Sequence, residues 1–170
     1  AVDAGARMIT VHGRTRQQFY KGEARWDLVR PVVEAVNVPV VVNGDITSLD
    51  AAREALDQSG AAAVMVGRGA QGQPWVVGQI GAGLAGRTMP SAPTGAALAD
   101  LVAEHYQAML LAYGRALGAR MARKHLDWYL EAAGIALDKP TRNGLLTADD
   151  PDNVLKMIPD LFSQDWRQAA

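Results

Sequence analysis

The nine residues VPVVVNGDI, at positions 38–46, decide the fold class of this chain. They form a nearly continuous apolar run that ends in a polar turn containing Gly44. A short apolar run without alternation is typical of a strand in a parallel sheet, where both faces are covered. The stretch therefore predicts a buried parallel strand whose carboxyl end carries polar groups.

The same pattern occurs once before this stretch and once after it. The apolar runs and the turns that follow them are 8–11 with HGRTR at 12–16, and 62–66 with GRGA at 67–70. Between the runs, segment 26–36 has apolar residues at helical spacing. Segment 49–58 is predicted to be a helix that Ser48 or Thr47 can cap, with Gly60 just past its end. Successive runs lie about 25 to 30 residues apart, which is the size of a βα unit. We therefore predict three such units, with parallel strands buried on both faces.

Three βα units are too few for a closed barrel or a complete doubly wound sheet. The chain also opens in a segment that reads as the end of a helix. We therefore expect residues 1–88 to be the C-terminal part of a TIM (β/α)8 barrel that is truncated. A small three-stranded α/β domain, complete in itself, is the alternative. Open strand edges in a truncated barrel would favour self-association.

The pattern of the chain changes after residue 88. Residues 89–96, with Pro90 and Pro93, are predicted to be a linker. Residues 97–170 contain no strand-like run, so we predict a small all-α domain, at the low end of size for an independent core. Its expected helices are 97–113, 116–133 and about 151–162.

Two finer predictions within this helical domain rest on single residues. We expect Pro140 and Gly144 to mark a loop before the third helix, because both residue types disfavour helix interiors. We expect Leu98, Leu101 and Leu111 to share one face of the first helix.

Composition restricts the classes of function. The formal net charge of -1 excludes a uniformly basic nucleic-acid binder but not a local basic patch. No apolar run reaches the ~18 residues of a membrane-spanning helix. Without cysteine, this chain has no disulfide, thiolate metal site or cysteine nucleophile. We expect a cytoplasmic location, no membrane partner and, because the histidines are far apart in sequence, no metal site.

Two of the predicted turns have the composition of a phosphate site. Ligands of a TIM barrel bind at the carboxyl ends of its strands, and phosphates often lie after the last two. Asn43, Gly44 and Asp45 follow the second predicted strand, and Gly67 and Arg68 follow the third. Glycine lets the backbone approach a phosphate, and arginine offers it a charged fork. For either turn alone, a tight turn with an Asp cap is the alternative.

Three residues at the first turn are further candidates. His12 ends the first predicted strand, where a neutral imidazole could hydrogen-bond a ring carbonyl or nitrogen of a ligand, although a lone histidine there is more often structural. Arg14 and Arg16 follow it, either as solvated charges or as contacts to an anionic substrate.

The predicted helix at 116–133 carries a group of cations. Arg120, Arg123 and Lys124 lie at helical spacing, so they could line a phosphate backbone. A solvated face that Asp127 partly neutralises is the alternative. Residues 95–170 hold 8 basic and 10 acidic side chains, so any nucleic-acid binding there would depend on a local patch.

Four strings, in this order and spacing, resemble the bacterial tRNA-dihydrouridine synthases. They are HGRTR at 12–16, NGDI at 43–46, MVGRGAQGQPW at 65–75 and RKHLDWYL at 123–130. The strings are specific only in combination, and the resemblance extends over essentially all 170 residues.

The resemblance implies a TIM barrel that binds FMN at its C-terminal face. It implies FMN contacts, chiefly to the phosphate and ribityl end, from Asn43, Gly44, Asp45, Gly67 and Arg68. By the same resemblance, His12 should approach the flavin ring system. A helical C-terminal domain in this family grips tRNA, which would give a role to Arg120, Arg123 and Lys124.

An activity is implied in the same way. Family enzymes reduce a uridine of tRNA to 5,6-dihydrouridine: NADPH reduces FMN, reduced FMN gives hydride to uridine C6, and a cysteine protonates C5. That cysteine belongs to the first half of the barrel, and this chain has none. We therefore expect no catalytic residue in this chain and no synthase activity from it alone. A fragment of another phosphate-binding flavin oxidoreductase, or an RNA-binding module without catalysis, is the alternative.

Overall fold

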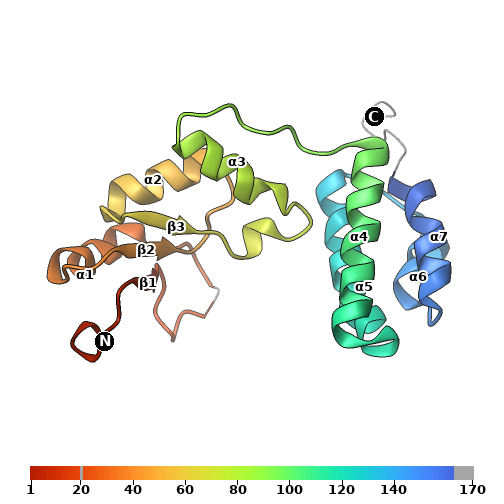
Figure 1. Ribbon diagram of the computed structural model, residues 1–170, viewed down its shortest axis with the longest axis horizontal. Coiled ribbons are helices and arrows are strands. Elements are labelled where there is room, and N and C mark those ends of the chain that lie inside the picture. The colour runs from red at the N-terminus through yellow and green to blue at the C-terminus, as the bar shows by residue number, and fades with distance from the viewer. Residues whose placement is uncertain (20, 163–170) are drawn as a thin grey trace. The chain divides into compact units, whose positions relative to one another are not determined.

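The computed structural model describes residues 1–19 and 21–162 of the chain (Figure 1). The chain divides into two compact units, which are described separately. The first unit comprises residues 1–70 and 74–91, and the second comprises residues 71–73 and 92–170. The predicted linker at 89–96 is therefore divided between the two units.

The first unit is built on a parallel sheet of three strands in the order β1-β2-β3. The strands are β1 (Ile9–His12), β2 (Val40–Asn43) and β3 (Ala63–Met65). The register pairs His12 with Asn43, and Asn43 with Met65, so the carboxyl ends of all three strands meet in one row. The prediction of three successive βα units with parallel strands is confirmed, and this arrangement is consistent with part of a barrel.

The connections between these strands are helical. They are η2 (Trp26–Val29), α1 (Arg30–Ala35) and α2 (Leu49–Ser59), with η1 (Val2–Ala4) before the sheet and η3 (Arg68–Ala70) and α3 (Trp75–Leu84) after it. The Ser48 side chain caps α2 by accepting a hydrogen bond from Ala51 N, and Gly60 ends it with φ 69°. The predicted helix 26–36 is split in two. Pro31 explains the break, because it has no N–H to continue a helical ladder from η2.

The core of the first unit lies on one face of the sheet. Val40 and Val42 point into this core from β2, together with Ala52 of α2 and Ile80 of α3. Figure 1 shows α2 and α3 over this face. The other face is open at Thr10, His12, Ala63 and Met65. Successive side chains of a strand point to opposite faces, so β1 and β3 are covered on one face only. The prediction of burial on both faces is therefore wrong for these two strands and holds for Val40–Val42.

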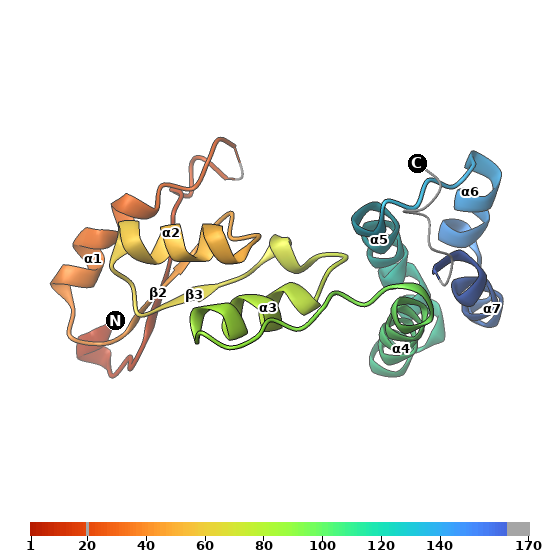
Figure 2. The ribbon, with the colours of Figure 1, turned by 90° about the horizontal axis from the view of Figure 1, so that it is seen from above.

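The second unit consists mainly of helices. They are α4 (Gly95–Tyr113), α5 (Arg115–Ala133), α6 (Lys139–Thr147) and α7 (Pro151–Phe162). Helix α4 packs against both α5 and α7 (Figure 2). A Cβ atom at Gly118 of α5 would lie 2.6 Å from the Met109 carbonyl oxygen, so a glycine is needed at this contact between α4 and α5. None of the helices among residues 1–19 and 21–162 is long and apolar enough to cross a membrane.

Helix α6 occupies the place of a predicted loop. The prediction from Pro140 and Gly144 is wrong because both residues are compatible with this helix. The Asp138 side chain caps it by accepting hydrogen bonds from Thr141 N and Oγ1. Pro140 lies in its first turn, where a missing N–H costs no hydrogen bond.

Helix α4 buries a different face from the one that its leucines suggested. Leu98, Val102, Tyr106 and Met109 are buried, whereas Leu111 is 90% exposed. Leu98 and Leu111 therefore do not share a face. An apolar residue near the end of a helix need not face the core, and single exposed leucines are ordinary on protein surfaces.

Candidate functional site

A row of polar groups joins the carboxyl ends of the three strands. His12 Nδ1 lies 2.6 Å from Asn43 Oδ1, and Asn43 Nδ2 donates a hydrogen bond to the Met65 carbonyl oxygen at 2.7 Å. His12 is exposed on the open face of the sheet, and Asn43 is half-buried. The structure thus brings together two candidate residues that are 31 positions apart in the sequence.

The turn after β2 has a backbone that favours glycine. Gly44 has φ 122° and Asp45 has φ 51°, so two successive residues adopt left-handed conformations. A Cβ atom at Gly44 would also lie 2.8 Å from the Ala24 Cβ atom. Glycine at position 44 is therefore explained by the turn and by its packing, without reference to a ligand.

Asp45 links two of the candidate arginines. Arg14 donates to Asp45 Oδ2 and, through the same nitrogen, to the Gly22 carbonyl oxygen at 2.6 Å. Arg68 Nη2 lies 3.7 Å from Asp45 Oδ1. Partial burial alone would raise the Asp45 pKa, but the hydrogen bonds from Arg14 and Ala24 N and the charges of both arginines lower it below its usual range. The carboxylate is therefore ionised and fixed in place.

The two arginines differ in what they offer to a ligand. The Arg14 side chain is 2% exposed, and its Nε and Nη1 atoms are buried without a partner among the described residues. Arg68 is 54% exposed. Arg14 thus lies inside the turn, which does not fit a solvated charge, whereas its contact with an anionic substrate stays a prediction. Arg16 lies nearby in the chain and is exposed.

The segment from Gly13 to Trp26 is fastened to the turn after β2. Gly13 N donates to the Asn43 carbonyl oxygen at 2.8 Å, and Trp26 Nε1 donates to the Gly44 carbonyl oxygen at 2.8 Å. Ala24 N donates to Asp45 Oδ2 at 2.9 Å. Sequence reasoning assigned Trp26 only to a helical stripe, and no sequence signal identified these bonds. They fix the turn to the segment that follows β1.

The turn after β3 contains two glycines with different surroundings. A Cβ atom at Gly69 would lie 2.4 Å from the Ile46 carbonyl oxygen, so packing between the two turns explains this glycine. A Cβ atom at Gly67 would meet nothing closer than Asn43 Nδ2, at 3.8 Å. Gly67 is exposed and has room beside it, and it precedes the exposed Arg68. The position at which a ligand could approach the backbone is therefore Gly67.

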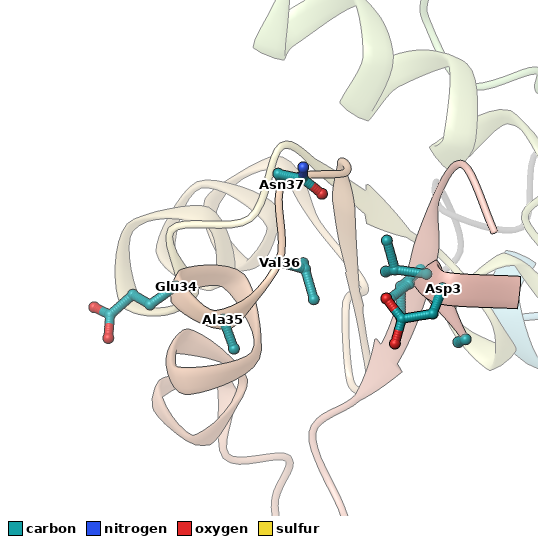
Figure 3. Close-up of a pocket in the computed structure, with 8 residues that line it drawn as sticks. Asp3, Glu34, Ala35, Val36 and Asn37 are labelled. Carbon is teal, nitrogen blue, oxygen red and sulfur yellow. The ribbon is translucent and has the colours of Figure 1, made fainter. Parts of the chain in front are cut away.

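A separate cleft of about 650 Å³ lies near the amino ends of β1 and β2 (Figure 3). Asp3, Ile9, Glu34 and Asn37 are among the residues that line it. Two of these side chains are acidic, so the cleft is unsuited to a phosphate. Ligands of parallel α/β sheets bind at the opposite, carboxyl ends of the strands. The His12–Asn43–Arg68 edge remains the better candidate.

The cations of α5 have different neighbours. Arg123 donates to the Thr147 carbonyl oxygen at 3.4 Å and lies 3.5 Å from Asp149 Oδ1, so it is tied to the segment that follows α6. Lys124 is exposed and lies 5.6 Å from the centre of the Trp128 ring. Arg120 is exposed one turn before Lys124. Arg120 and Lys124 thus form the accessible part of the predicted cationic face.

Aromatic side chains lie beside these cations. The rings of His105 and His125 are 5.2 Å apart in a T-shaped arrangement, and those of His125 and Trp128 are 4.9 Å apart. His105 Nδ1 lies 3.0 Å from Tyr129 Oη. Burial lowers the pKa of His105 and His125, with further contributions at His125 from His105 and Lys124. Burial raises the pKa of Tyr129 to about 12. His125, Trp128 and Tyr129 follow the cations in the sequence, but the contact with His105 could not be predicted because His105 comes from another helix, α4.

Residues 71–73 belong to the helical unit, although they follow the Arg68 turn in the chain. Gly72 has φ 71°, and a Cβ atom there would lie 2.1 Å from the Trp128 carbonyl oxygen. Only glycine allows the segment to pack against the backbone of α5 at this point. Among residues 1–19 and 21–162, no group of three or more His, Cys, Asp or Glu side chains could hold a metal ion.

Comparison with known proteins gives consistent matches. The family model described as "Dihydrouridine synthase (Dus)" matches residues 1–164. A "Probable tRNA-dihydrouridine synthase" of Rhodobacter capsulatus is 54% identical over 98% of this chain and 50% of its own length. A protein of the same name from Rickettsia conorii is 45% identical over 96% of this chain and 49% of its own. A "tRNA-dihydrouridine synthase B" of Vibrio cholerae is 42% identical over 92% of this chain and 49% of its own. The chain spans about half the length of these curated relatives.

Proposed function

We infer that this chain, which belongs to the dihydrouridine synthase family, supplies the phosphate end of an FMN site and a tRNA-binding surface to an enzyme that reduces uridine in tRNA to 5,6-dihydrouridine. NADPH would be the electron source, and the reaction would take place in the cytoplasm. The observation that carries the proposal is the row of polar groups at one edge of the sheet, beside the exposed Arg68.

The residues at this edge suit the phosphate of FMN. Arg14, Arg68 and Asp45 together carry one net positive charge, and the accessible arginine of the group is Arg68. Gly67 leaves room for a close approach to the backbone. Charge-assisted hydrogen bonds from arginine are among the stronger interactions with a phosphate. Asp45 would act by orienting Arg68, and Asn43 and Gly44 by shaping the edge beside His12.

Bound FMN would supply the hydride chemistry that no side chain of this chain provides. This chain would hold the phosphate of FMN and orient His12. The open face of its sheet would stay accessible to the rest of the cofactor. The chain contains no cysteine that could protonate the base. We therefore propose that catalysis needs residues from the half of the relatives' sequence that this chain does not cover.

The proposed substrate surface for tRNA lies on the helical unit. Arg120 and Lys124 are exposed one helical turn apart, and Trp128 lies against Lys124. Cations bind the phosphate backbone, and an aromatic ring can stack on an unpaired base. A target base must also leave its stack to be reduced, at a cost of a few kcal/mol, which favours a protein that grips the tRNA at more than one point. Exposed Arg16 would be a further contact.

The FMN proposal is tested by the retention of flavin. The chain is mixed with FMN and desalted, and the bound flavin is measured by visible absorption. Arg68→Met should weaken FMN binding by about tenfold or more, because it removes a charge-assisted hydrogen bond. Arg87→Met, which changes an exposed arginine of the same unit, is the control. Equal FMN binding by the wild type and Arg68→Met would contradict the proposed role of Arg68.

The tRNA proposal is tested by filter binding at two salt concentrations. Replacing Arg120 and Lys124 by Gln should weaken binding and lower the slope of log K against log salt by about 1 for each lost phosphate contact. Lys156→Gln, at an exposed position of α7, is the control. Binding that does not respond to salt would argue against this surface. The curated relatives are named for tRNA, which favours this substrate over a small metabolite.

A further inference from the structure

The Asn43 side chain has only one orientation that satisfies both of its neighbours. Its amide contacts the Met65 carbonyl oxygen on one side and the His12 ring on the other. A carbonyl oxygen can only accept a hydrogen bond, so the atom that faces Met65 must be the amide nitrogen, Nδ2. The amide oxygen, Oδ1, therefore faces His12 at 2.6 Å.

This orientation determines which nitrogen of His12 carries the proton. An amide oxygen is only an acceptor, so the neighbouring ring nitrogen, Nδ1, must be the donor. In a neutral imidazole with a proton on Nδ1, the other nitrogen, Nε2, is an acceptor. We propose that Asn43 is a positioning residue that holds His12 as its Nδ1–H tautomer and thereby makes Nε2 a hydrogen-bond acceptor at the carboxyl edge of the sheet.

The backbone keeps the two side chains in this relation. His12 and Asn43 are register partners at the last pair of the β1–β2 ladder. A Cβ atom at Gly44 would lie 3.2 Å from His12 Cε1 and 3.4 Å from Nδ1, so that edge of the ring lies against the glycine. Gly44 also has φ 122°, a conformation that favours glycine. Because glycine has no side chain, the His12 ring can pack directly against it.

The tautomer restricts the groups that His12 can meet in a ligand. Through Nε2, a neutral His12 accepts a hydrogen bond from a hydroxyl or an N–H group and cannot donate one to a carbonyl oxygen. This consequence rests on the proposed FMN site, where ribityl hydroxyls and ring N–H groups are the matching donors. Sequence reasoning treated a ring carbonyl and a ring nitrogen as equivalent partners, and the hydrogen bond to Asn43 separates them.

The tautomer is measured directly by long-range ¹⁵N–¹H correlation NMR of the histidine rings in the intact chain. At about pH 9 imidazole side chains are neutral, and protonated and unprotonated ring nitrogens resonate far apart. The chain has three histidines, so the signals that disappear in His12→Gln identify His12. We expect the wild-type spectrum to show the proton of His12 on Nδ1. A proton on Nε2 would overturn the proposal.

Two variants test whether Asn43 is the cause. Asn43→Asp keeps an acceptor oxygen and should keep the Nδ1–H signal. Asn43→Leu has a similar size but no acceptor, and it should shift His12 to a predominantly Nε2–H signal. Asn43→Ala carries the same expectation if Asn43→Leu does not fold, and backbone amide shifts of β1 and β2 report folding. An unchanged tautomer in a folded Leu or Ala variant would remove Asn43 from this role.

Flavin retention distinguishes this inference from the proposed function. An Nδ1–H signal in a chain that binds FMN equally well with and without Arg68 contradicts the FMN site and supports the tautomer. An Nε2–H signal in a chain that loses FMN with Arg68→Met contradicts the tautomer alone.

Discussion

The two units of the chain enclose their apolar side chains differently. In the α/β unit, Val40 and Val42 are buried under helices, but the opposite face of the sheet leaves Met65 48% exposed. In the helical unit, Ile158 and Phe162 of α7 are at most 1% exposed, although the unit is small. The helical unit thus closes a core from its own helices, whereas the α/β unit leaves β1 and β3 uncovered on one face of its sheet. The comparison indicates that the two units should respond differently to equivalent substitutions.

The largest difference is expected for large apolar side chains. Phe162→Ala should lower the free energy of unfolding by about 3–5 kcal/mol, because it leaves a cavity in a closed core. Met65→Ala, on the open face of the sheet, should change it by about 0.5 kcal/mol or less. Urea denaturation followed by circular dichroism measures both. Equal effects would mean that the open face is covered in solution, for example by the predicted self-association.

The next effect concerns the charge cluster of the α/β unit. Asp45→Asn should lower the free energy of unfolding by about 1–3 kcal/mol, because it leaves the buried Arg14 without its counter-charge. The Asp45 pKa is lowered by folding, so its contribution is present above about pH 3.9 and is lost as the pH falls through the folded value. Urea denaturation at neutral pH and at about pH 3 tests this. A wild-type chain and an Asp45→Asn variant that lose equal stability on acidification would contradict it.

A smaller effect is expected where helices α4 and α5 touch. Gly118→Ala places a Cβ atom 2.6 Å from the Met109 carbonyl oxygen, so we expect a net loss of about 1–2 kcal/mol after the gain in helix propensity. Gly144→Ala is the matched control, since a Cβ atom there meets nothing within 4 Å, and it should stabilise α6 by up to about 1 kcal/mol. Thermal unfolding of both variants gives the two signs. A stabilising Gly118→Ala would contradict the close contact.

The smallest expected effect is a pH dependence of stability that is specific to the helical unit. Folding lowers the pKa of His105 and His125, so the unfolded chain binds protons more readily than the folded chain does. The helical unit should therefore lose stability as the pH falls through about 6.5, whereas it is unaffected above that value. Urea denaturation at about pH 8 and pH 5.5, with His125→Gln beside the wild type, measures this slope. If stability depends on pH as strongly in His125→Gln as in the wild type, His125 does not cause this pH dependence.

Features that depend on local sequence could be predicted, and features that depend on distant contacts could not. The Ser48 cap of α2 and the bounds of α7 could be predicted because each depends on residues within one segment. The parallel sheet follows from three similar apolar runs. The burial of Arg14 could not be predicted because it depends on Asp45, 31 positions later in the chain. The α6 helix was missed because the effect of Pro140 depends on the cap that precedes it.

The candidate site likewise has features that the sequence predicts and features that it does not. The sequence predicts which residues follow each strand, and the register then brings His12 and Asn43 together. It does not predict that Arg123 is engaged with Thr147 and Asp149, since that contact depends on how the segment after α6 returns to α5. The RNA-binding role of the α5 cations therefore stays a prediction, and it now rests on Arg120 and Lys124.

The close packing of Ala24 against Gly44 also restricts which residues these two positions can accept by mutation. A Cβ atom at position 44 would lie 2.8 Å from the Ala24 Cβ atom, so the two positions draw on the same small volume. A mutation that adds a side chain at residue 44 meets both Ala24 and the His12 ring. In a library randomised at both positions, functional clones should therefore be restricted to the smallest residue pairs. The size of residue 24 would thus be linked to the size of residue 44, which lies in a different segment of the chain.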